Sequence, residues 1–253
     1  MQIYAIQFDI AWQDPDANFD KIRHLLSTID LAGGALLVLP EMFATGFSMN
    51  THQVVETLEG PTCRFLSDLA VTTACQVIAG VAIDGPRGPH NEALMVSSDG
   101  TLVHRYAKRH LFSYAHEDRH YRPGSNLITF TVDDTICSTH ICYDLRFPED
   151  FRTVTLRGAE LLVVIANWPS ARHAHWTTLL AARAIENQAY VLGVNRVGSD
   201  PTQHYAGDTC LFDPRGSLVA SAETQQGILH AELNLQELRD FRRDFPTLND
   251  VLP

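Results

Sequence analysis

Apolar residues recur every three to four positions in some stretches of the chain and form short, unbroken or alternating runs in others. The helical spacing predicts helices at residues 15–31, 62–75, 148–157 and 175–188, with a last helix from residue 235 onward. The runs predict strands at residues 3–8, 35–39, 77–83, 93–97, 102–106, 136–141, 161–166, 190–194, 210–212, 217–220 and 228–233. Helices and strands alternate, but hairpins interrupt the alternation. The pattern therefore predicts mixed sheets covered by helices, with two layers of sheet.

Composition narrows the class of protein. No repeat, low-complexity tract or flexible linker divides the 253 residues, so one domain over residues 1–253 is expected. A net charge of -11 disfavours nucleic acid or an anionic membrane surface as a partner. No apolar run approaches the length of about 18 residues that spans a membrane, and a strand-like segment right at the start leaves no room for a signal peptide. Five cysteines, an odd number, fit reduced thiols better than a disulfide framework and predict a cytoplasmic location.

Three reactive side chains each follow a predicted strand directly. Glu41 comes after the strand at 35–39, Lys108 after the strand at 102–106, and Cys142 after the strand at 136–141. Taken singly, they could be a solvated loop acid, a basic surface residue and a buried core cysteine. Ligands of layered α/β folds bind beyond the carboxyl ends of strands, so the coincidence of all three predicts a shared site.

The three residue types suit nucleophilic acyl transfer. Cys142 lies on a sharp turn between a strand and a helix start at Phe147-Pro148-Glu149, where backbone N–H groups are exposed. A thiol is mostly protonated at neutral pH and needs a base, and Glu41 can take its proton. Lys108 and the backbone N–H of Tyr143 can then stabilise the oxyanion of a tetrahedral intermediate.

These residues also carry a family resemblance. Leu39-Pro40-Glu41 and the segments at 106–112 and 141–149 resemble, in order and spacing, the three motifs of the nitrilase (carbon–nitrogen hydrolase) superfamily. The resemblance implies a four-layer αββα sandwich, a Glu-Lys-Cys triad, a thioester acyl-enzyme and a homodimer. It also implies a second glutamate near the thiol, which maps onto Glu117; taken alone, Glu117 could equally be an exposed loop acid.

Other segments are similar to the omega-amidase branch of this superfamily. They lie at 40–49, 166–169, 175–176, 182–188, 193–198 and 205–208. The resemblance implies hydrolysis of small dicarboxylic monoamides, such as 2-oxoglutaramate and 2-oxosuccinamate, with release of ammonia. Three alternatives stay open: another small-amide hydrolase, N-carbamoyl hydrolase or nitrilase of the superfamily; a redox-active thiol protein; and a non-catalytic binding member of the fold.

A substrate that ends in a carboxylate requires a cation in the pocket. Arg172 is the first candidate and Arg119 the second, although either can be an ordinary surface arginine. Three aromatic residues, Phe43, Tyr121 and Trp168, are expected to wall a small pocket, with core packing as the alternative.

No metal or organic cofactor is expected. His173 and His175 are two positions apart, which points their side chains in different directions on a helix and makes a poor metal pair. Cys137 is predicted to be a core residue. The helix at 175–188 carries an apolar stripe that could join the homodimer or only cover its own sheet: Trp176, Leu179, Leu180 and Ile185.

Overall fold

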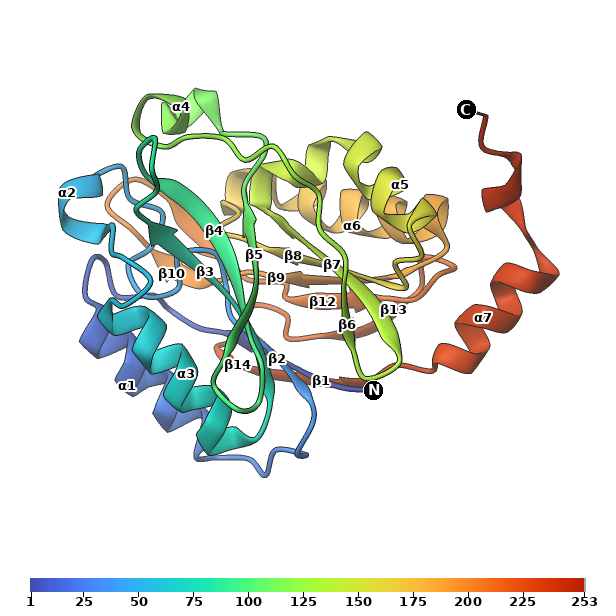
Figure 1. The fold of residues 1–253 in the computed structure, drawn as a ribbon, viewed down its shortest axis with the longest axis horizontal. Coiled ribbons are helices and arrows are strands. Elements are labelled where there is room, and N and C mark those ends of the chain that lie inside the picture. Colours follow the sequence, from blue (N-terminus) through green and yellow to red (C-terminus); the bar gives the residue numbers. More distant parts are fainter. Residues whose placement is uncertain (253) are drawn as a thin grey trace.

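Two six-stranded mixed sheets form the centre of the molecule, and helices cover the outer face of each (Figure 1). The computed structural model describes residues 1–252. The first sheet has the order β14 (Gly227–Glu232), β1 (Gln2–Gln7), β2 (Leu36–Val38), β3 (Gln76–Ile83), β4 (His90–Val96) and β5 (Leu102–Ala107). The second has the order β13 (Leu218–Ser221), β12 (Cys210–Phe212), β9 (Tyr190–Val194), β8 (Leu161–Ile165), β7 (Thr135–Ile141) and β6 (Phe130–Val132).

The helices lie mainly on the two outer faces (Figure 1). They are α1 (Pro15–Leu26), α2 (Thr51–Val54), α3 (Pro61–Thr73), α4 (Glu117–His120), α5 (Pro148–Leu156), α6 (His173–Asn187) and α7 (Leu235–Asp244). Short 3-10 turns are η1 (Ser113–Ala115), η2 (Cys142–Arg146), η3 (Ser170–Arg172) and η4 (Thr247–Asp250). A small separate sheet pairs β10 (Val197–Ser199) with β11 (His204–Ala206).

Side-chain alternation along the strands explains this layering. In β2, Leu36 and Val38 pack between the two sheets, whereas Leu37 packs on the outer face against α1 and α3. In β8, Val163 lies between the sheets and Val164 packs against α5 and α6. Both faces of each sheet are covered, which is why these strands are apolar at every position. The predicted four-layer αββα sandwich is confirmed.

Parallel pairing brings strand ends to a common edge. In the first sheet β2 pairs in parallel with β1 and β3, and in the second sheet β8 pairs in parallel with β7 and β9. Glu41 follows β2 and Cys142 follows β7, so the segments that carry them emerge where such folds bind ligands.

Several predicted boundaries are wrong for local reasons. The first helix ends at Leu26 and not at residue 31. The helix predicted from Thr62 begins at Pro61, and Gly60 is its cap; the N–H of Thr62 donates instead to Glu56. The predictions omit β6, β10, β11, α2 and α4, which have only three or four residues each, so their formation depends on tertiary partners.

The apolar stripe predicted on α6 divides between two environments. Trp176 and Leu180 are buried against the second sheet of their own chain, so they cannot form an exposed contact. Ile185 is 56% exposed. Cys137 is fully buried between the sheets, which confirms its prediction as a core residue.

Candidate active site

Glu41, Lys108 and Cys142 meet at one edge of the sandwich. The Lys108 Nζ atom lies 3.0 Å from Glu41 Oε1. The other carboxylate oxygen of Glu41 accepts a hydrogen bond from the backbone N–H of Asn167 at 2.8 Å, and the Cys142 Sγ atom lies 4.0 Å from the carbonyl oxygen of the same residue. The structure therefore brings together three side chains that are far apart in the sequence.

Unusual backbone conformations position these groups. Cys142 has a φ of 47°, in the left-handed region that non-glycine residues rarely adopt. Met42, directly after Glu41, has a φ of 43°, and His116, directly before the second glutamate, has a φ of 62°. Such conformations cost about 1–3 kcal/mol each and cluster at functional sites. Gly80 allows the backbone at Glu41 to approach β3 closely, because a Cβ atom at position 80 would lie 2.5 Å from the Glu41 Cα atom.

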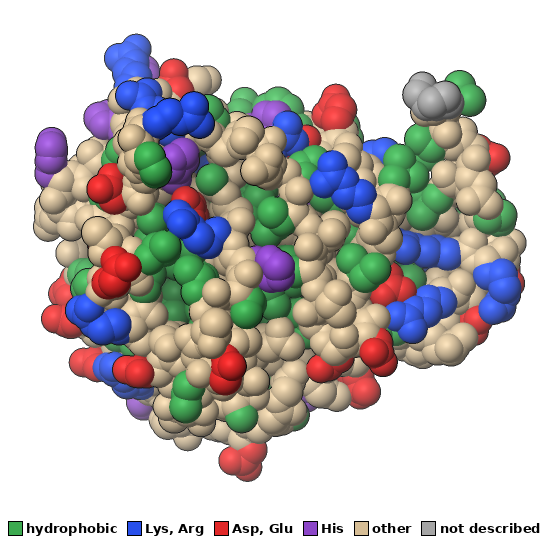
Figure 2. All heavy atoms as spheres, viewed as in Figure 1, with side chains coloured by type: hydrophobic (Ala, Val, Ile, Leu, Met, Phe, Trp, Pro, Cys, Tyr) green, Lys and Arg blue, Asp and Glu red, His purple; other side chains and the backbone are tan. Residues whose placement is uncertain are grey.

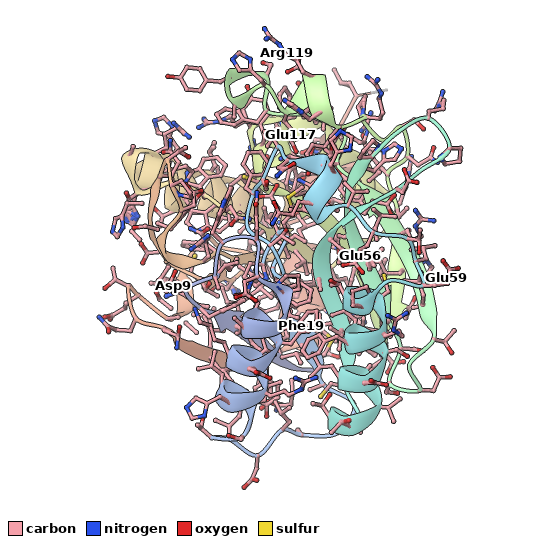
Figure 3. The ribbon with its side chains drawn as sticks, turned by 90° about the vertical axis from the view of Figure 1, so that its left-hand side faces the viewer. Asp9, Phe19, Glu56, Glu59, Glu117 and Arg119 are labelled. Carbon is pink, nitrogen blue, oxygen red and sulfur yellow. The ribbon has the colours of Figure 1, made fainter. Side chains whose placement is uncertain are left out.

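A second carboxylate completes a buried polar network. Glu117 Oε2 accepts hydrogen bonds from Lys108 Nζ at 2.9 Å and from the backbone N–H of Phe112 at 2.6 Å. The Asn91 side-chain amide donates to Glu41 at 2.7 Å and to Glu117 at 3.0 Å. The Glu41, Lys108 and Glu117 side chains are fully buried, so their charges are held with little screening by water. Figure 3 shows Glu117 directed into the body of the molecule.

The network sets the protonation state of the thiol at rest. Burial raises the pKa of the Cys142 thiol well above its ordinary value, and the charges of Glu41 and Glu117 raise it further, against the opposing effect of Lys108. Burial alone would lower the pKa of Lys108, but the charges of Glu117 and Glu41 raise it above its ordinary value. The resting site thus holds a neutral thiol beside a charged ammonium, and the thiol requires a base to become a nucleophile.

A buried aspartate ties the thiol's turn to the strand before Lys108. Asp144 accepts hydrogen bonds from the Tyr106 hydroxyl at 2.7 Å, the backbone N–H of His110 at 2.9 Å and that of Ile141 at 3.0 Å. Burial raises the pKa of the Asp144 carboxyl to about 6. These bonds join the end of β5 to the end of β7 across the two sheets.

A cavity of about 430 Å³ opens beside the thiol. It is lined by Trp12, Phe47, Met49, Lys108, Phe112, Tyr114, Ala115, Cys142, Tyr143, Arg146, Asn167, Trp168, Pro169, Arg172, Asp200, Thr202, Gln203 and Tyr205. The lining includes Trp168 and Arg172, two of the predicted substrate-contacting residues.

Two arginines and two aromatic residues form part of the wall. The guanidinium of Arg146 lies 4.8 Å from the ring centroid of Trp168, and that of Arg172 lies 5.3 Å from the ring centroid of Phe112. The Trp168 indole N–H donates to the carbonyl oxygen of Arg172 at 2.8 Å, which links the two arginines through one tryptophan. Within residues 1–252 neither guanidinium forms an ion pair with a carboxylate, so both are available to an anionic ligand.

Three other predicted substrate contacts are not among the residues that line the cavity. Phe43 packs on the outer face of the first sheet, with its ring centroid 6.2 Å from that of Phe19, which Figure 3 shows in the helical layer. Tyr121 is fully buried and donates its hydroxyl hydrogen to a backbone carbonyl oxygen at 2.7 Å. Arg119 is exposed on α4, at the outer edge of the molecule in Figure 3. Core packing accounts for the two aromatics, and solvation accounts for the arginine.

Four site residues were absent from the predictions: Asn91, Arg146, Asn167 and Asp200. Arg146 had a usable signal, because it follows the thiol by four residues in the same short turn. The two asparagines act by donating hydrogen bonds to Glu41 from other strand ends, a role with no local pattern.

Two features are absent from the described residues, 1–252. No group of three or more histidine, cysteine, aspartate or glutamate side chains in this range is arranged to hold a metal ion. None of the helices in the same range is long and apolar enough to cross a membrane.

Known proteins share this architecture and sequence. A family model described as carbon–nitrogen hydrolase matches residues 3–243, and the chain belongs to that family. The omega-amidase YafV of Yersinia enterocolitica is 40% identical over 253 residues, covering 99% of this chain and 96% of that protein. The 2-oxoglutaramate amidase of Bacillus subtilis (strain 168) is 34% identical over 251 residues, covering 98% of this chain and 96% of that protein.

Solved structures agree with the fold. XC1258 from Xanthomonas campestris, a CN-hydrolase superfamily protein, has a TM-score of 0.94 and 33% sequence identity, covering 100% of this chain and 97% of that one. Nit3 of Saccharomyces cerevisiae, a nitrilase superfamily member, has a TM-score of 0.87 and 26% sequence identity, covering 97% of this chain and 94% of that one. The predicted membership of the nitrilase superfamily is confirmed.

Proposed function

We propose that this chain hydrolyses the C–N bond of a small omega-amide that carries a carboxylate at its other end, such as 2-oxoglutaramate or 2-oxosuccinamate, to an acid and ammonia. One observation carries the proposal: the cavity that reaches Cys142 and Lys108 also contains two arginines without carboxylate partners in residues 1–252. The names of the relatives, omega-amidase and 2-oxoglutaramate amidase, support the same substrate class.

In the first half of the reaction, Glu41 accepts the proton of the Cys142 thiol, and the thiolate attacks the amide carbonyl carbon. The carbonyl oxygen becomes an oxyanion, stabilised by Lys108 Nζ and the backbone N–H of Tyr143. Glu41 then returns the proton to the amide nitrogen as the C–N bond breaks. Ammonia leaves, and the acyl group remains on sulfur as a thioester.

In the second half, Glu41 takes a proton from a water molecule, whose oxygen attacks the thioester carbonyl. Collapse of the second oxyanion breaks the C–S bond, and the proton held by Glu41 passes to the sulfur. The free acid and the resting thiol result, so protons balance over the cycle. Glu117 supports both halves by holding Lys108 at 2.9 Å from its carboxylate.

Arginine in the cavity wall fixes the other end of the substrate. A guanidinium forms paired hydrogen bonds with a carboxylate, so Arg172 and Arg146 are the proposed partners of the substrate carboxylate. Anchoring that end places the amide carbonyl within reach of the thiol, which lowers the entropic part of the barrier. Trp168 supports both arginines, as its contacts indicate.

Ammonia release by purified protein tests the proposal. A hydrogen bond to a charged group contributes about 1.5–3 kcal/mol, so Arg172→Ala should lower kcat/KM for the acid amide about 10–100-fold. The neutral methyl ester of the same substrate should lose far less. Arg119→Ala is the matched control, because this arginine is exposed and outside the cavity.

The outcomes separate the parts of the proposal. Equal losses of kcat/KM for the acid and for the ester would show that Arg172 does not bind the substrate carboxylate. Arg146 would then be the expected partner, and Arg146→Ala would test it in the same way. A wild-type preference for neutral amides over the acid would refute the omega-amidase assignment, while a Cys142-dependent amidase would remain.

We also propose that two copies of the chain form a homodimer and that the protein works in the reducing cytoplasm. Exposed apolar side chains on α6 and on the C-terminal arm, residues 235–252, support the first part: Ile185 at 56%, Phe245 at 58% and Leu252 at 86%. Figure 2 shows hydrophobic side chains gathered toward the end of that arm. Five free cysteines support the second part. Light scattering that gives a monomer mass at micromolar concentration would contradict the dimer.

A further inference from the structure

Asn91, near the start of β4, connects the buried charges of the site without lining the cavity. Its side-chain nitrogen donates to Glu41 Oε1 at 2.7 Å and to Glu117 Oε1 at 3.0 Å, and its backbone carbonyl oxygen accepts from the backbone N–H of Lys108 at 2.9 Å. The side chain is fully buried, and it is not among the residues that line the cavity. One residue therefore contacts both carboxylates and the segment that carries the ammonium, and the mechanism above gives it no part.

The chemistry of its neighbours fixes the orientation of the Asn91 amide. An ionised carboxylate accepts hydrogen bonds and cannot donate them, so the two carboxylates require the NH2 group to face them. Both N–H groups are then used, and the buried amide oxygen is left without a partner in residues 1–252. A buried acceptor without a partner is unfavourable and rare in folded proteins. The site retains one here, which indicates that the two donated hydrogen bonds serve the site itself.

The hydrogen bonds of Glu41 differ between its two oxygens. Each carboxylate oxygen has two acceptor sites. Oε1 accepts from Asn91 and from Lys108 Nζ at 3.0 Å, so both of its sites are used. Oε2 accepts one hydrogen bond from the backbone N–H of Asn167 at 2.8 Å, and within residues 1–252 no second N–H donor reaches it. The acceptor site that remains for the thiol proton is therefore on Oε2.

The position of the thiol agrees with this assignment. The Cys142 Sγ atom lies 4.0 Å from the carbonyl oxygen of Asn167, the residue whose N–H is bonded to Oε2. A hydrogen bond with Glu41 is one of the factors that raise the pKa of this thiol. Asn91 and Lys108 both donate to Oε1, so the thiol and the ammonium use different oxygens of the same carboxylate.

We propose that Asn91 is a positioning residue for the general base, because its amide occupies Glu41 Oε1 and thereby leaves Oε2 to take the Cys142 proton. The inference rests on the proposed function, in which Glu41 is that base. The second N–H of the amide holds Glu117, so that both carboxylates keep their places around Lys108. Asn91 acts through these carboxylates, since it does not line the cavity that holds the substrate.

Two substitutions separate hydrogen bonding from packing. Asn91→Leu keeps the size of the side chain and removes both donors. Asn91→Ala leaves polar space in which a water molecule can donate in place of the amide. Loss of hydrogen bonds to charged groups should lower kcat for 2-oxoglutaramate about 10–100-fold in Asn91→Leu and less in Asn91→Ala, with little change in KM. If packing were the role of Asn91, alanine would be the more harmful replacement, because it leaves a cavity.

The pH dependence of Cys142 alkylation by iodoacetamide gives a second readout, which needs no substrate. The charges of Glu41 and Glu117 raise the pKa of this thiol against the opposing charge of Lys108. Without the amide donors the two carboxylate charges are compensated less, so the alkylation profile should move to higher pH. In a site that has merely loosened, the thiol is exposed to water and its profile should move to lower pH.

Asn187→Leu is the matched control. Asn187 on α6 is also fully buried, and its amide donates to the carbonyl oxygen of Arg183 at 3.0 Å and to Glu186 at 3.5 Å. Its own amide oxygen likewise has no partner in the described residues, 1–252. The change should lower the urea midpoint of unfolding, but it should leave kcat and the alkylation profile as in the wild type.

Several results would overturn this inference: wild-type kcat in Asn91→Leu, a lower kcat in Asn91→Ala than in Asn91→Leu, or an alkylation profile of either variant that stays in place or moves to lower pH. A profile of Asn187→Leu that moves as far as theirs would do the same. If Asn91→Leu does not fold, the profile of Asn91→Ala decides. Absence of ammonia release by the wild type would overturn the proposed function, and the alkylation profiles would still test the arrangement at Asn91.

Discussion

Replacing Glu117 by glutamine separates the support of Lys108 from the chemistry of the thiol. The change keeps the size of the side chain but removes one of the two carboxylates that hold the buried ammonium. Lys108 Nζ lies 2.9 Å from Glu117 Oε2 and 3.0 Å from Glu41 Oε1. At an effective dielectric constant of about 20, the charge pair at the shorter distance contributes roughly 6 kcal/mol before desolvation is counted. The glutamine amide group would also face the N–H donors of Asn91 or Lys108.

The net effect on catalysis is smaller, because Lys108 keeps its bond to Glu41. A lost hydrogen bond between charged groups costs about 1.5–3 kcal/mol, so kcat should fall about 10–100-fold. The thiol should respond in the opposite sense. The charge of Glu117 is one of the factors that raise the pKa of Cys142, so its removal lowers that pKa and increases the thiolate fraction at a given pH.

The assay therefore has two measurements on one protein: ammonia release, and the pH dependence of Cys142 alkylation by iodoacetamide. Glu117→Gln should turn over more slowly while its alkylation profile moves to lower pH. Asp118→Asn is the matched control, since it removes a carboxylate from an exposed neighbour on α4 and should change neither. Wild-type kcat in Glu117→Gln, or an alkylation profile that stays in place or moves to higher pH, would refute the reasoning.

Other expectations follow from the same structure. Cys142→Ala should abolish turnover, and mass spectrometry of the wild type with substrate should detect an acyl adduct on this thiol; comparable turnover by the variant would exclude it as the nucleophile. Gly80→Ala should lower kcat, because its Cβ atom would lie 2.5 Å from Glu41 Cα, whereas Gly33→Ala, 4.0 Å from its nearest neighbour, should be tolerated. Burial lowers the pKa of His140 from 6.5 to about 3, so the stability that its neutral form provides is present above pH 6.5 and is lost as pH falls towards 3. The loss in the free energy of unfolding is about 2 kcal/mol at pH 5. Urea titrations at pH 7 and pH 5 measure it, and the His140→Gln variant should lose less stability between the two pH values than the wild type does. An equal loss in both proteins would contradict this expectation. Exhaustive chelation should leave ammonia release unchanged, and loss restored by one added metal would show a metal requirement.

The sequence by itself determined the layers of the fold and the reacting groups. Apolar runs such as residues 161–165 predict buried strands, because strands covered on both faces need apolar side chains at every position. The sequence also predicts a shared site for Glu41, Lys108 and Cys142. Each follows a strand directly, and strand ends of layered folds converge. These signals are local in the chain, and they agree with one another.

Short elements and long-range contacts were decided by the tertiary structure. Strands of three residues, such as β10 and β11, have too few positions to show a period, and they form because a partner strand is present. Phe43 and Tyr121 are aromatic residues of the type that often lines a pocket. The fold instead places Phe43 on the outer face of a sheet and buries Tyr121, whose hydroxyl donates to a backbone carbonyl oxygen. An aromatic side chain looks the same in sequence whether it faces a core or a cavity.

The same limit applies to charge. The sequence does not distinguish Arg119 from Arg172. The fold places Arg119 in solvent on α4 and Arg172 in the cavity wall. Asp200 is an ordinary turn residue in the sequence, and only the fold shows that its carboxylate accepts hydrogen bonds from its own turn and from Tyr205 in the wall of that cavity. Local pattern determines which residue types can react, because propensity and periodicity act over a few residues. Contacts between residues more than a hundred positions apart, such as the hydrogen bond from the backbone N–H of Asn167 to the Glu41 carboxylate, form only once both sheets have packed.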